Sequence, residues 1–290
     1  MNDVYKQHEV LQWAFSFLKE HGREEAVAEI LLQHHLNVSR SKFYTTMHEP
    51  IRKEIVDIFK RDIMKHAKTG VPVQHLTGIA HFYSRSFQVN ENVLIPRFET
   101  EELVHHVIHF VQKEYKDEPV TIVDVGTGSG VIAITLALEL FNVKVYATDI
   151  SKAALQVAKT NAQMHDANVQ FLYGDFLQPM IEQNIIPQII VSNPPYINKK
   201  DEALLSDTVI EFDPHLALFA ENEGLKAYEE ITSQLTSVID EKANVFFEIG
   251  YDQAEAVTSI VKKRFPYSDV KTIKDINHKD RIISAEITQK

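Results

Sequence analysis

The chain contains no cysteine among its 290 residues, and this absence removes several classes of site at once. Without thiols there are no disulfide bonds, zinc-thiolate sites, iron–sulfur clusters or cysteine nucleophiles. Long apolar runs are missing as well, since no stretch approaches the roughly 20 consecutive apolar residues that a membrane helix needs. The first residues, MNDVYKQHEV, do not combine a basic segment with an apolar one as a secretory signal would. We therefore expect a soluble, cytoplasmic protein without membrane association.

Positive charge is also in short supply, because 30 lysines and arginines stand against 41 acidic residues and leave a formal charge of -11. A protein that holds nucleic acid by bulk charge needs basic residues to neutralise phosphates. We therefore expect no stable nucleic-acid binding, although a local basic groove could exist. The hydrophobic fraction of 44% is typical of a globular protein, and the length fits about two domains.

Three segments of different pattern divide the chain. Residues 1–70 carry apolar residues at helical spacing and no strand pattern, which predicts a small helical domain. Residues 71–95 are turn-rich at first and then alternate apolar with polar side chains, which predicts a strand or hairpin that acts as a linker. Residues 96–290 form the third segment and are expected to fold as a second, larger domain.

From residue 120 onward, short apolar strands alternate with helices. Such alternation predicts an α/β fold with a doubly wound, mostly parallel sheet covered by helices on both faces. The expected strands are 120–125, 143–149, 169–175, 188–195, 243–250 and 281–288. The expected helices are 129–140, 151–165, 225–238 and 253–265.

The first of these strands runs into a glycine-rich turn. Gly126, Gly128 and Gly130 alternate with Thr127 and Ser129, and glycine lets a backbone approach a ligand where a Cβ atom would collide. The spacing differs from the Walker A and dinucleotide-binding patterns. It resembles the first motif of the S-adenosylmethionine-dependent methyltransferases, although an ordinary strand–helix connection would also use such a turn.

Two further strand ends suit a nucleoside ligand beside this turn. Asp149 ends the second strand, 19 residues after Gly130, where a carboxylate can accept hydrogen bonds from both ribose hydroxyls. Asp175 and Phe176 follow the third strand, where they could bind the amine of adenine and stack on its ring. An ordinary turn with a core phenylalanine is the alternative for that pair. We predict S-adenosylmethionine as the cofactor.

The fourth strand ends in Asn193, Pro194, Pro195 and Tyr196. Two successive prolines cannot continue a sheet ladder, so they fix the backbone where substrates bind in such folds. The Asn193 oxygen and the Pro194 carbonyl could accept both N–H bonds of a planar nitrogen, and Tyr196 offers a flat face for stacking. Asn193 is also expected to border the cofactor. The pattern predicts methylation of an amide or ring-amine nitrogen without a metal, and a simple turn is the alternative.

Over nearly the whole chain, the sequence is similar to the protein-(glutamine-N5) methyltransferases that modify class-1 peptide chain release factors. The similarity is carried by GVPVQHLTGIAHFY, LIPRFETEELV, VDVGTGSGVIAI, TDISKAALQVAKTNA, VSNPPYI and FFEIGYDQ. Residues 94–101 are the most specific part, because generic methyltransferases lack them. Asn-Pro-Pro-Tyr is shared with adenine-N6 enzymes of DNA and RNA.

The resemblance implies a methyltransferase fold with a small N-terminal helical domain that helps to dock the release factor. It implies methyl transfer from S-adenosylmethionine to the glutamine of a Gly-Gly-Gln loop. The positions that match cofactor residues of the family are Gly126, Thr127, Gly128, Ser129, Gly130, Asp149 and Phe176. The positions that match its glutamine site are Asn193, Pro194, Pro195 and Tyr196.

The sequence supports other functions less well. An adenine-N6 methyltransferase acting on DNA or RNA is the alternative enzyme, and the acidic net charge counts against it. A non-catalytic binding module is a further alternative, and the intact glycine-rich and Asn-Pro-Pro-Tyr motifs count against it. His105 and His109 have a spacing that could chelate a metal, but no third ligand type is evident and a solvated helix face is the interpretation we favour. Glu99, Glu101 and Glu102 open a predicted helix, where negative charge suits the helix dipole.

A few residues depart from the family pattern. Phe98 stands where proline is usual, Ser84 where glycine is common, and Asp213 lies in a changed stretch after the reaction motif. These departures leave the loop after Tyr196 and the cover of the cofactor site undetermined. Glu248 ends the fifth strand of the predicted sheet, and the sequence assigns it no role.

Overall fold

The computed structural model describes residues 5–116, 118–205 and 207–289. The chain divides into a compact unit of Met1–Ile79 with Ser206–Phe212, and another of Ala80–Leu205 with Asp213–Lys290.

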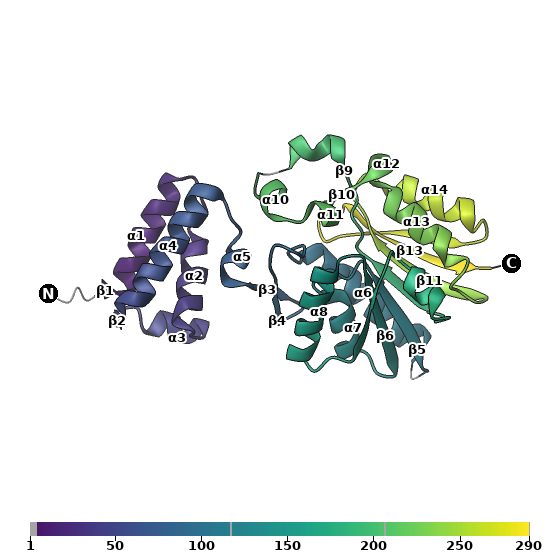
Figure 1. Ribbon diagram of the computed structural model, residues 1–290, viewed down its shortest axis with the longest axis horizontal. Helices are drawn as coiled ribbons and strands as arrows, with labels where there is room; N and C mark the ends of the chain where they lie inside the picture. The colour runs from purple at the N-terminus through teal and green to yellow at the C-terminus, as the bar shows by residue number, and fades with distance from the viewer. Residues whose placement is uncertain (1–4, 117, 206, 290) are drawn as a thin grey trace. The chain divides into compact units, whose positions relative to one another are not determined.

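The first unit is a helical bundle. Figure 1 shows its three longer helices packed side by side, α1 (Gln7–Glu20), α2 (Ala26–Leu36) and α4 (Lys53–Thr69). Their apolar faces share a core, and its fully buried members include Leu18, Leu31 and Phe59. Shorter helices complete the unit, namely α3 (Arg40–Thr45), α5 (Val73–Thr77) and α10 (Asp207–Phe212). The predicted helical character is confirmed.

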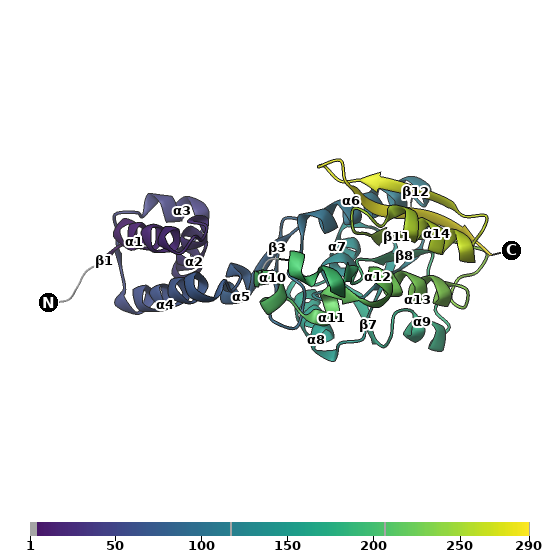
Figure 2. The same cartoon turned by 90° about the horizontal axis from the view of Figure 1, so that it is seen from above.

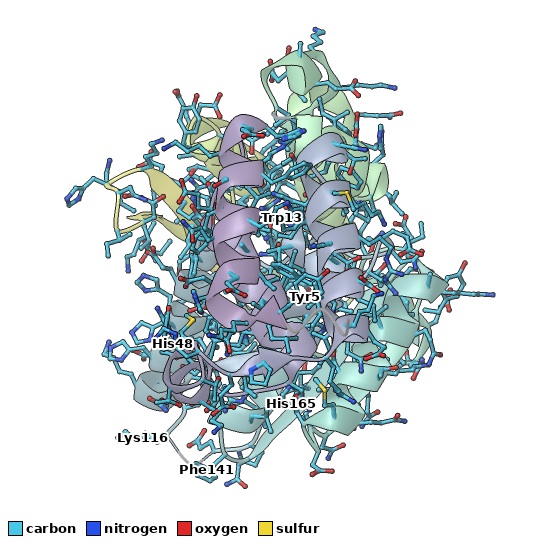
Figure 3. All side chains as sticks on the ribbon, turned by 90° about the vertical axis from the view of Figure 1, so that its left-hand side faces the viewer. Tyr5, Trp13, His48, Lys116, Phe141 and His165 are labelled. Atoms are coloured by element: carbon cyan, nitrogen blue, oxygen red, sulfur yellow. The ribbon has the colours of Figure 1, made fainter. Side chains whose placement is uncertain are left out.

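One feature of this unit was not predicted. Strand β1 (Tyr5–Lys6) pairs antiparallel with β2 (Pro50–Ile51), so the expectation of no strand in this region is wrong. Strands of two residues are too short to show a periodic pattern. Lys60 of α4 lies 5.0 Å from the ring centroid of Tyr5 and 5.3 Å from that of Trp13, both labelled in Figure 3. These cation–π contacts connect β1, α1 and α4.

A hairpin opens the second unit. Strands β3 (Ile79–Phe82) and β4 (Arg85–Gln88) are joined by Tyr83 and Ser84, whose φ angles are 48° and 62°. This left-handed turn explains why glycine suits the position of Ser84. The hairpin expected within residues 71–95 is present, whereas α5 was not expected there.

The central sheet contains seven strands of the described chain, in the order β12-β13-β11-β8-β5-β6-β7. Their bounds are β5 (Val120–Val125), β6 (Val143–Asp149), β7 (Val169–Tyr173), β8 (Ile189–Ser192), β11 (Lys242–Glu248), β12 (Asp269–Lys274) and β13 (Asp280–Thr288). The strands from β11 to β7 run parallel, and β13, which forms the yellow hairpin with β12 in Figures 1 and 2, runs antiparallel to its neighbours. The doubly wound, mostly parallel sheet is therefore confirmed.

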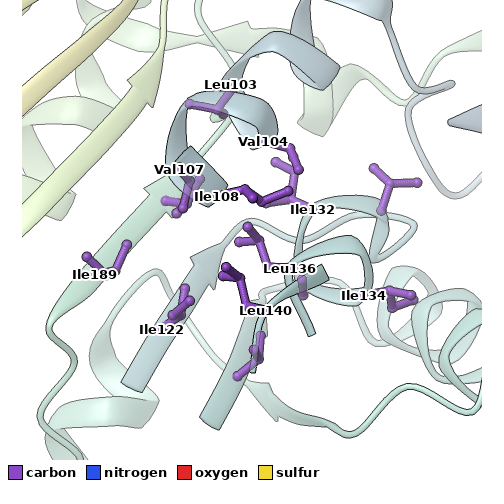
Figure 4. Packing of buried hydrophobic residues seen from close by; sticks show 14 of the residues in the cluster. Leu103, Val104, Val107, Ile108, Ile122, Ile132, Ile134, Leu136, Leu140 and Ile189 are labelled. Atoms are coloured by element: carbon purple, nitrogen blue, oxygen red, sulfur yellow. The ribbon is translucent and has the colours of Figure 1, made fainter. Parts of the chain in front are cut away.

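Alternate residues of the strands face different helical layers. On β5, Ile122 belongs to one core, while Val123 belongs to another. The first core is covered by α6 (Phe98–Glu114), α7 (Val131–Glu139) and α8 (Lys152–Met164), and Figure 4 shows Leu103 and Leu136 of this layer in the same cluster as Ile122. The second core is covered by α9 (Gln178–Glu182), α13 (Lys226–Leu235) and α14 (Ala254–Arg264). Successive side chains of a strand point to opposite faces of the sheet. Because helices cover both faces, most residues of β5, β8 and β11 are buried, and these strands are largely apolar runs in the sequence.

Short elements fill the long connection after β8. They are β9 (Ile197–Asn198), η1 (Lys199–Leu204), α11 (His215–Leu218), β10 (Phe219–Ala220) and α12 (Glu221–Gly224). Gly224 has a φ of 81°, and a Cβ atom there would lie 2.1 Å from the carbonyl oxygen of Tyr196. The connection thus passes too close to the reaction motif for any other residue at this position. Within the described residues, no helix combines the length and apolar character needed to cross a membrane.

Candidate functional site

A cavity of about 410 Å³ lies at the carboxyl ends of β5, β6 and β8, a size typical of small-molecule sites. The order of the sheet reverses between β5 and β8, which is where doubly wound folds bind ligands. Of the predicted site residues, those that line the cavity are Gly126, Thr127, Gly128, Ser129, Asp149, Asp175, Phe176, Asn193 and Pro195. Gly130, Pro194 and Tyr196 do not line it.

The glycine-rich turn leaves open space on its ligand side. Gly126 and Gly128 have φ angles of 74° and 55°, and a Cβ atom on either would meet nothing within 4 Å. Gly130 differs, because a Cβ atom there would lie 2.9 Å from Ile134 and 3.0 Å from Ala158. The first two glycines therefore shape a cradle beside the cavity, whereas Gly130 allows α7 and α8 to pack closely.

A buried carboxyl supports this turn from below. Oδ2 of Asp124 accepts hydrogen bonds from the Thr127 hydroxyl at 2.6 Å and from the Ala133 amide at 3.2 Å. Burial raises the pKa of Asp124 to about 7. This role was not predicted, because in the sequence Asp124 is only a polar residue near the end of a buried strand.

Asp149 joins the turn to the end of β6. Its carboxylate accepts hydrogen bonds from the amide of Gly128 at 2.9 Å and from that of Ser151 at 2.8 Å. Burial raises its pKa, and the two backbone hydrogen bonds work in the opposite direction. Each carboxylate oxygen keeps acceptor capacity beyond these bonds. The residue thus fits a ligand that offers two neighbouring hydroxyls, as a ribose does.

Gly174, Asp175 and Phe176 form the wall that follows β7. A Cβ atom on Gly174 would lie 2.5 Å from Pro179, so the chain can turn here only through glycine. Phe176 follows with a φ of 47°, a left-handed conformation that is unusual for a large residue. Both Asp175 and Phe176 line the cavity, and together with the glycine cradle they fit an adenosine ligand.

Asn193 stands at the end of β8, on the opposite wall. Ser192 donates a hydrogen bond to the carbonyl of Val125 at 2.6 Å, which fixes this strand end beside β5. The Asn193 amide donates to the Thr100 hydroxyl at 3.0 Å, and that hydroxyl donates to Glu248 at 2.8 Å. Thr100 was missed by the sequence analysis, and Glu248 was noted there without a role.

Pro194 and Tyr196 follow Asn193 and are not among the residues that line the cavity. Pro194 is buried, and the Tyr196 carbonyl accepts a hydrogen bond from Gln253 at 2.9 Å. The Tyr196 ring packs against the second core, and burial, with a contribution from Glu248, raises its pKa to about 12. Tyr196 is therefore a neutral phenol at any ordinary pH.

The segment after the reaction motif also contributes to the cavity lining. Pro214, Leu216 and Ala217 line it together with Arg97. Arg97 forms an ion pair with the buried carboxylate of Asp213 at 2.8 Å. The segment around Asp213, which departs from the family pattern, therefore lies next to the residues that line the cavity. Phe98, the other departure near this site, is 83% exposed at the start of α6.

The acidic residues of α6 have separate structural contacts. Glu101 accepts a hydrogen bond from the Tyr83 amide in the hairpin, and Glu102 accepts one from the Ile276 amide between β12 and β13. In the part of the chain that the structure describes, no group of three or more His, Asp or Glu side chains could hold a metal ion.

Comparisons with known proteins identify the class first. A sequence model described as a methyltransferase small domain matches residues 107–214. A solved structure of the hMettl16 catalytic domain in complex with the MAT2A 3'UTR hairpin 6 is 13% identical, covers 82% of each chain and has a TM-score of 0.53, which shows likeness of fold alone. The fold and the cavity at its switch point define an S-adenosylmethionine-dependent methyltransferase.

Full-length relatives then identify the family. The release factor glutamine methyltransferase of Bacillus subtilis (strain 168) is 46% identical over 96% of this chain and 97% of its own length. That of Staphylococcus aureus (strain NCTC 8325 / PS 47) is 44% identical over 95% and 97%. A sequence model of the PrmC N-terminal domain matches residues 9–78. The chain belongs to the release factor glutamine methyltransferase family.

Proposed function

We propose that this chain transfers a methyl group from S-adenosylmethionine to the side-chain amide nitrogen of a glutamine, in the Gly-Gly-Gln motif of a class-1 peptide chain release factor. The observation that carries the proposal is the position of Asn193, which lines the same cavity as the glycine cradle and Asp149. Membership of the family supports the substrate, and relatives aligned over nearly the full chain do not favour an adenine-N6 enzyme.

The cofactor occupies the wall built by β5, β6 and β7. The cradle at Gly126 and Gly128 receives the amino acid part of the cofactor, and Asp149 accepts hydrogen bonds from the ribose hydroxyls. Asp175 and Phe176 bind the adenine. Bound there, S-adenosylmethionine supplies a methyl group on a positively charged sulfur.

The substrate amide lies against the end of β8. An amide nitrogen is a poor nucleophile because its lone pair is delocalised over the carbonyl. The Asn193 oxygen and the Pro194 carbonyl accept its N–H bonds and favour a less conjugated nitrogen. Preorganised groups of this kind are worth about 10²–10³ in rate. Tyr196, protonated because its pKa lies at about 12, takes no part as a base, and the proton leaves to water after transfer.

The helical unit supplies docking surface for the release factor in this proposal. It has a core of its own and matches a distinct N-terminal domain of the family. Deleting residues 1–70 should raise KM for the release factor at least 10-fold while S-adenosylhomocysteine affinity changes less than threefold. Equal KM values for the truncated and full chains would contradict the docking role.

Labelled S-adenosylmethionine tests the reaction itself. The full chain is incubated with a release factor, with the same factor carrying alanine in place of the motif glutamine, and with DNA or RNA. Label should appear only on the intact release factor, and mass spectrometry should place one methyl group on that glutamine. Label on nucleic acid, or equal label on both forms of the factor, would refute the proposal.

A further inference from the structure

The Asn193 side chain is the end of a buried chain of hydrogen bonds. Phe247 of β11 lies opposite Ser192 of β8, so the next residue on β11, Glu248, comes beside Asn193. Thr100, in the first turn of α6, lies between the two side chains. Glu248 and Thr100 are only 1% and 3% exposed, so water does not replace these contacts.

Above its pKa, an ionised Glu248 sets the direction of this chain of hydrogen bonds. A threonine hydroxyl has a single proton, and an ionised carboxylate accepts hydrogen bonds but donates none. Thr100 therefore gives its proton to Glu248 and can only accept from Asn193. Only the NH₂ end of the Asn193 carboxamide satisfies that requirement, so its oxygen is left for the cavity that Asn193 lines.

We propose that Glu248, acting through the Thr100 hydroxyl, is a positioning residue that holds the Asn193 carboxamide with its oxygen toward the methyl-accepting amide. The inference rests on the proposed function and gives a role to a carboxyl that the reaction itself does not use. Without this constraint, the Asn193 carboxamide could rotate by half a turn and present its NH₂ group to the substrate amide. Both groups are hydrogen-bond donors, so no hydrogen bond could form between them.

Several charged and titratable groups surround Glu248. Burial raises the pKa of Glu248 to about 7, while the hydrogen bond from Thr100, the charge of Arg281 on β13 and the nearby Asn193 amide oppose that rise. Glu99 on α6 adds to it. The Tyr196 and Tyr228 phenols face the carboxyl as well, and both are neutral because burial raises their pKa values. Protonation of Glu248 would make it a hydrogen-bond donor and free the Asn193 carboxamide to rotate.

Substitutions at Thr100 separate positioning from packing. Thr100→Val keeps the shape of the side chain and removes the hydroxyl, so kcat should fall about 10- to 100-fold with KM for S-adenosylmethionine changed less than threefold. Thr100→Ser restores the hydroxyl and should recover most of kcat. Thr135→Val is the matched control, because Thr135 is buried in α7 and its hydroxyl has no partner among the described residues. Equal kcat values for Thr100→Val and Thr100→Ser would overturn the proposal.

Glu248 is tested by its pH dependence and by nuclear magnetic resonance. The fall of kcat below about pH 7 in the wild type should disappear in Glu248→Gln, and an unchanged profile would count against Glu248. The Asn193 side-chain NH₂ signal, assigned through its loss in Asn193→Asp, should exchange slowly with water in the wild type and Thr100→Ser and quickly in Thr100→Val. Because this signal needs no methyl acceptor, it tests the hydrogen-bond chain even if a release factor is not methylated. Equal exchange in all three proteins would overturn the proposal.

Discussion

At the scale of single residues, one carboxylate links the glycine-rich turn to the end of β6 beside the cavity, where we propose that the ribose binds. Asp149 accepts backbone hydrogen bonds from both Gly128 and Ser151, so it orders the turn and presents its remaining acceptor sites to the cavity. The identity of this residue could be predicted, because an acid at the end of the second strand has a clear physical purpose.

Asp149→Asn should therefore weaken cofactor binding. The variant loses the charge, and its NH₂ group must face an amide that also donates. S-adenosylhomocysteine affinity should fall about 10- to 100-fold, as expected for hydrogen bonds to a charged group worth about 1.5–3 kcal/mol. Isothermal titration calorimetry measures this change, with the exposed Asp166→Asn as control. An unchanged Kd would show that Asp149 does not hold the ligand.

Other residues show where sequence reasoning ends. Gly130 was predicted to bind the cofactor as part of a motif; it is not among the residues that line the cavity, and a Cβ atom there would lie 2.9 Å from Ile134 and 3.0 Å from Ala158. Thr100 could not be predicted, because it lies 93 positions from Asn193 and 148 from Glu248. Contacts of that kind depend on sheet order and helix placement, and no local pattern encodes them.

At the scale of elements, the buried strands were predictable and the edges were not. Strands β5 and β6 match their predicted bounds, because both faces of each are covered and the apolar run is continuous. Strand β12 was missed, because its residues Asp269–Lys274 are mostly exposed at the sheet edge and carry no apolar run. The two-residue strands and short helices after β8 were missed for want of any periodicity.

One of these connections contributes residues to the cavity lining, and we expect it to slow the release of a bound ligand. Arg97 at the start of α6 holds the segment after Asp213 in place through their ion pair. Arg97→Ala should accelerate dissociation of S-adenosylhomocysteine about 3- to 10-fold, since a pair of this exposure is worth about 1 kcal/mol. Stopped-flow displacement measures the rate. Asp213→Asn should give a similar change, and Lys113→Ala, which breaks an exposed pair with Glu114, should give none.

The variant that combines Arg97→Ala with Asp213→Asn tests whether the ion pair is responsible. If its dissociation rate changed by the full product of the two single effects, Arg97 and Asp213 would act independently and the ion pair would not explain the faster release.

At the scale of the whole molecule, two buried carboxyls make stability depend on pH. Burial raises the pKa values of Asp124 and Glu248 to about 7, whereas an unfolded chain ionises such groups near pH 4. Between these values the folded protein binds more protons than the unfolded one. The contribution of these groups to the free energy of unfolding should therefore be highest below about pH 4, fall between pH 4 and 7, and level off above pH 7.

Asp124→Asn tests this sign, because asparagine does not titrate and can still accept from Thr127 and Ala133. The wild type should lose on the order of 2–4 kcal/mol from this group between pH 5 and 8. Urea unfolding at both pH values should show a smaller loss in the variant. A variant whose pH dependence matches that of the wild type would rule out Asp124 as a source.

The assignment of elements to units was only partly predictable at this scale. Helix α10 groups with the N-terminal helices, although the sequence places it after the reaction motif. His75 and Phe212 lie in the same unit with ring centroids 6.5 Å apart. Neither composition nor residue spacing indicates that a short helix will pack with a unit formed by a distant part of the chain.

In the proposed reaction, Asn193 is the central acceptor for the glutamine N–H, at a site that the substrate shares with the cofactor. Single-turnover methylation of a release factor by Asn193→Ala, together with the Kd for S-adenosylhomocysteine, measures this directly. We predict a rate lower by about 10²–10³ and a Kd within threefold of the wild type. A near-normal rate, or a rate lost only because the cofactor no longer binds, would contradict the account.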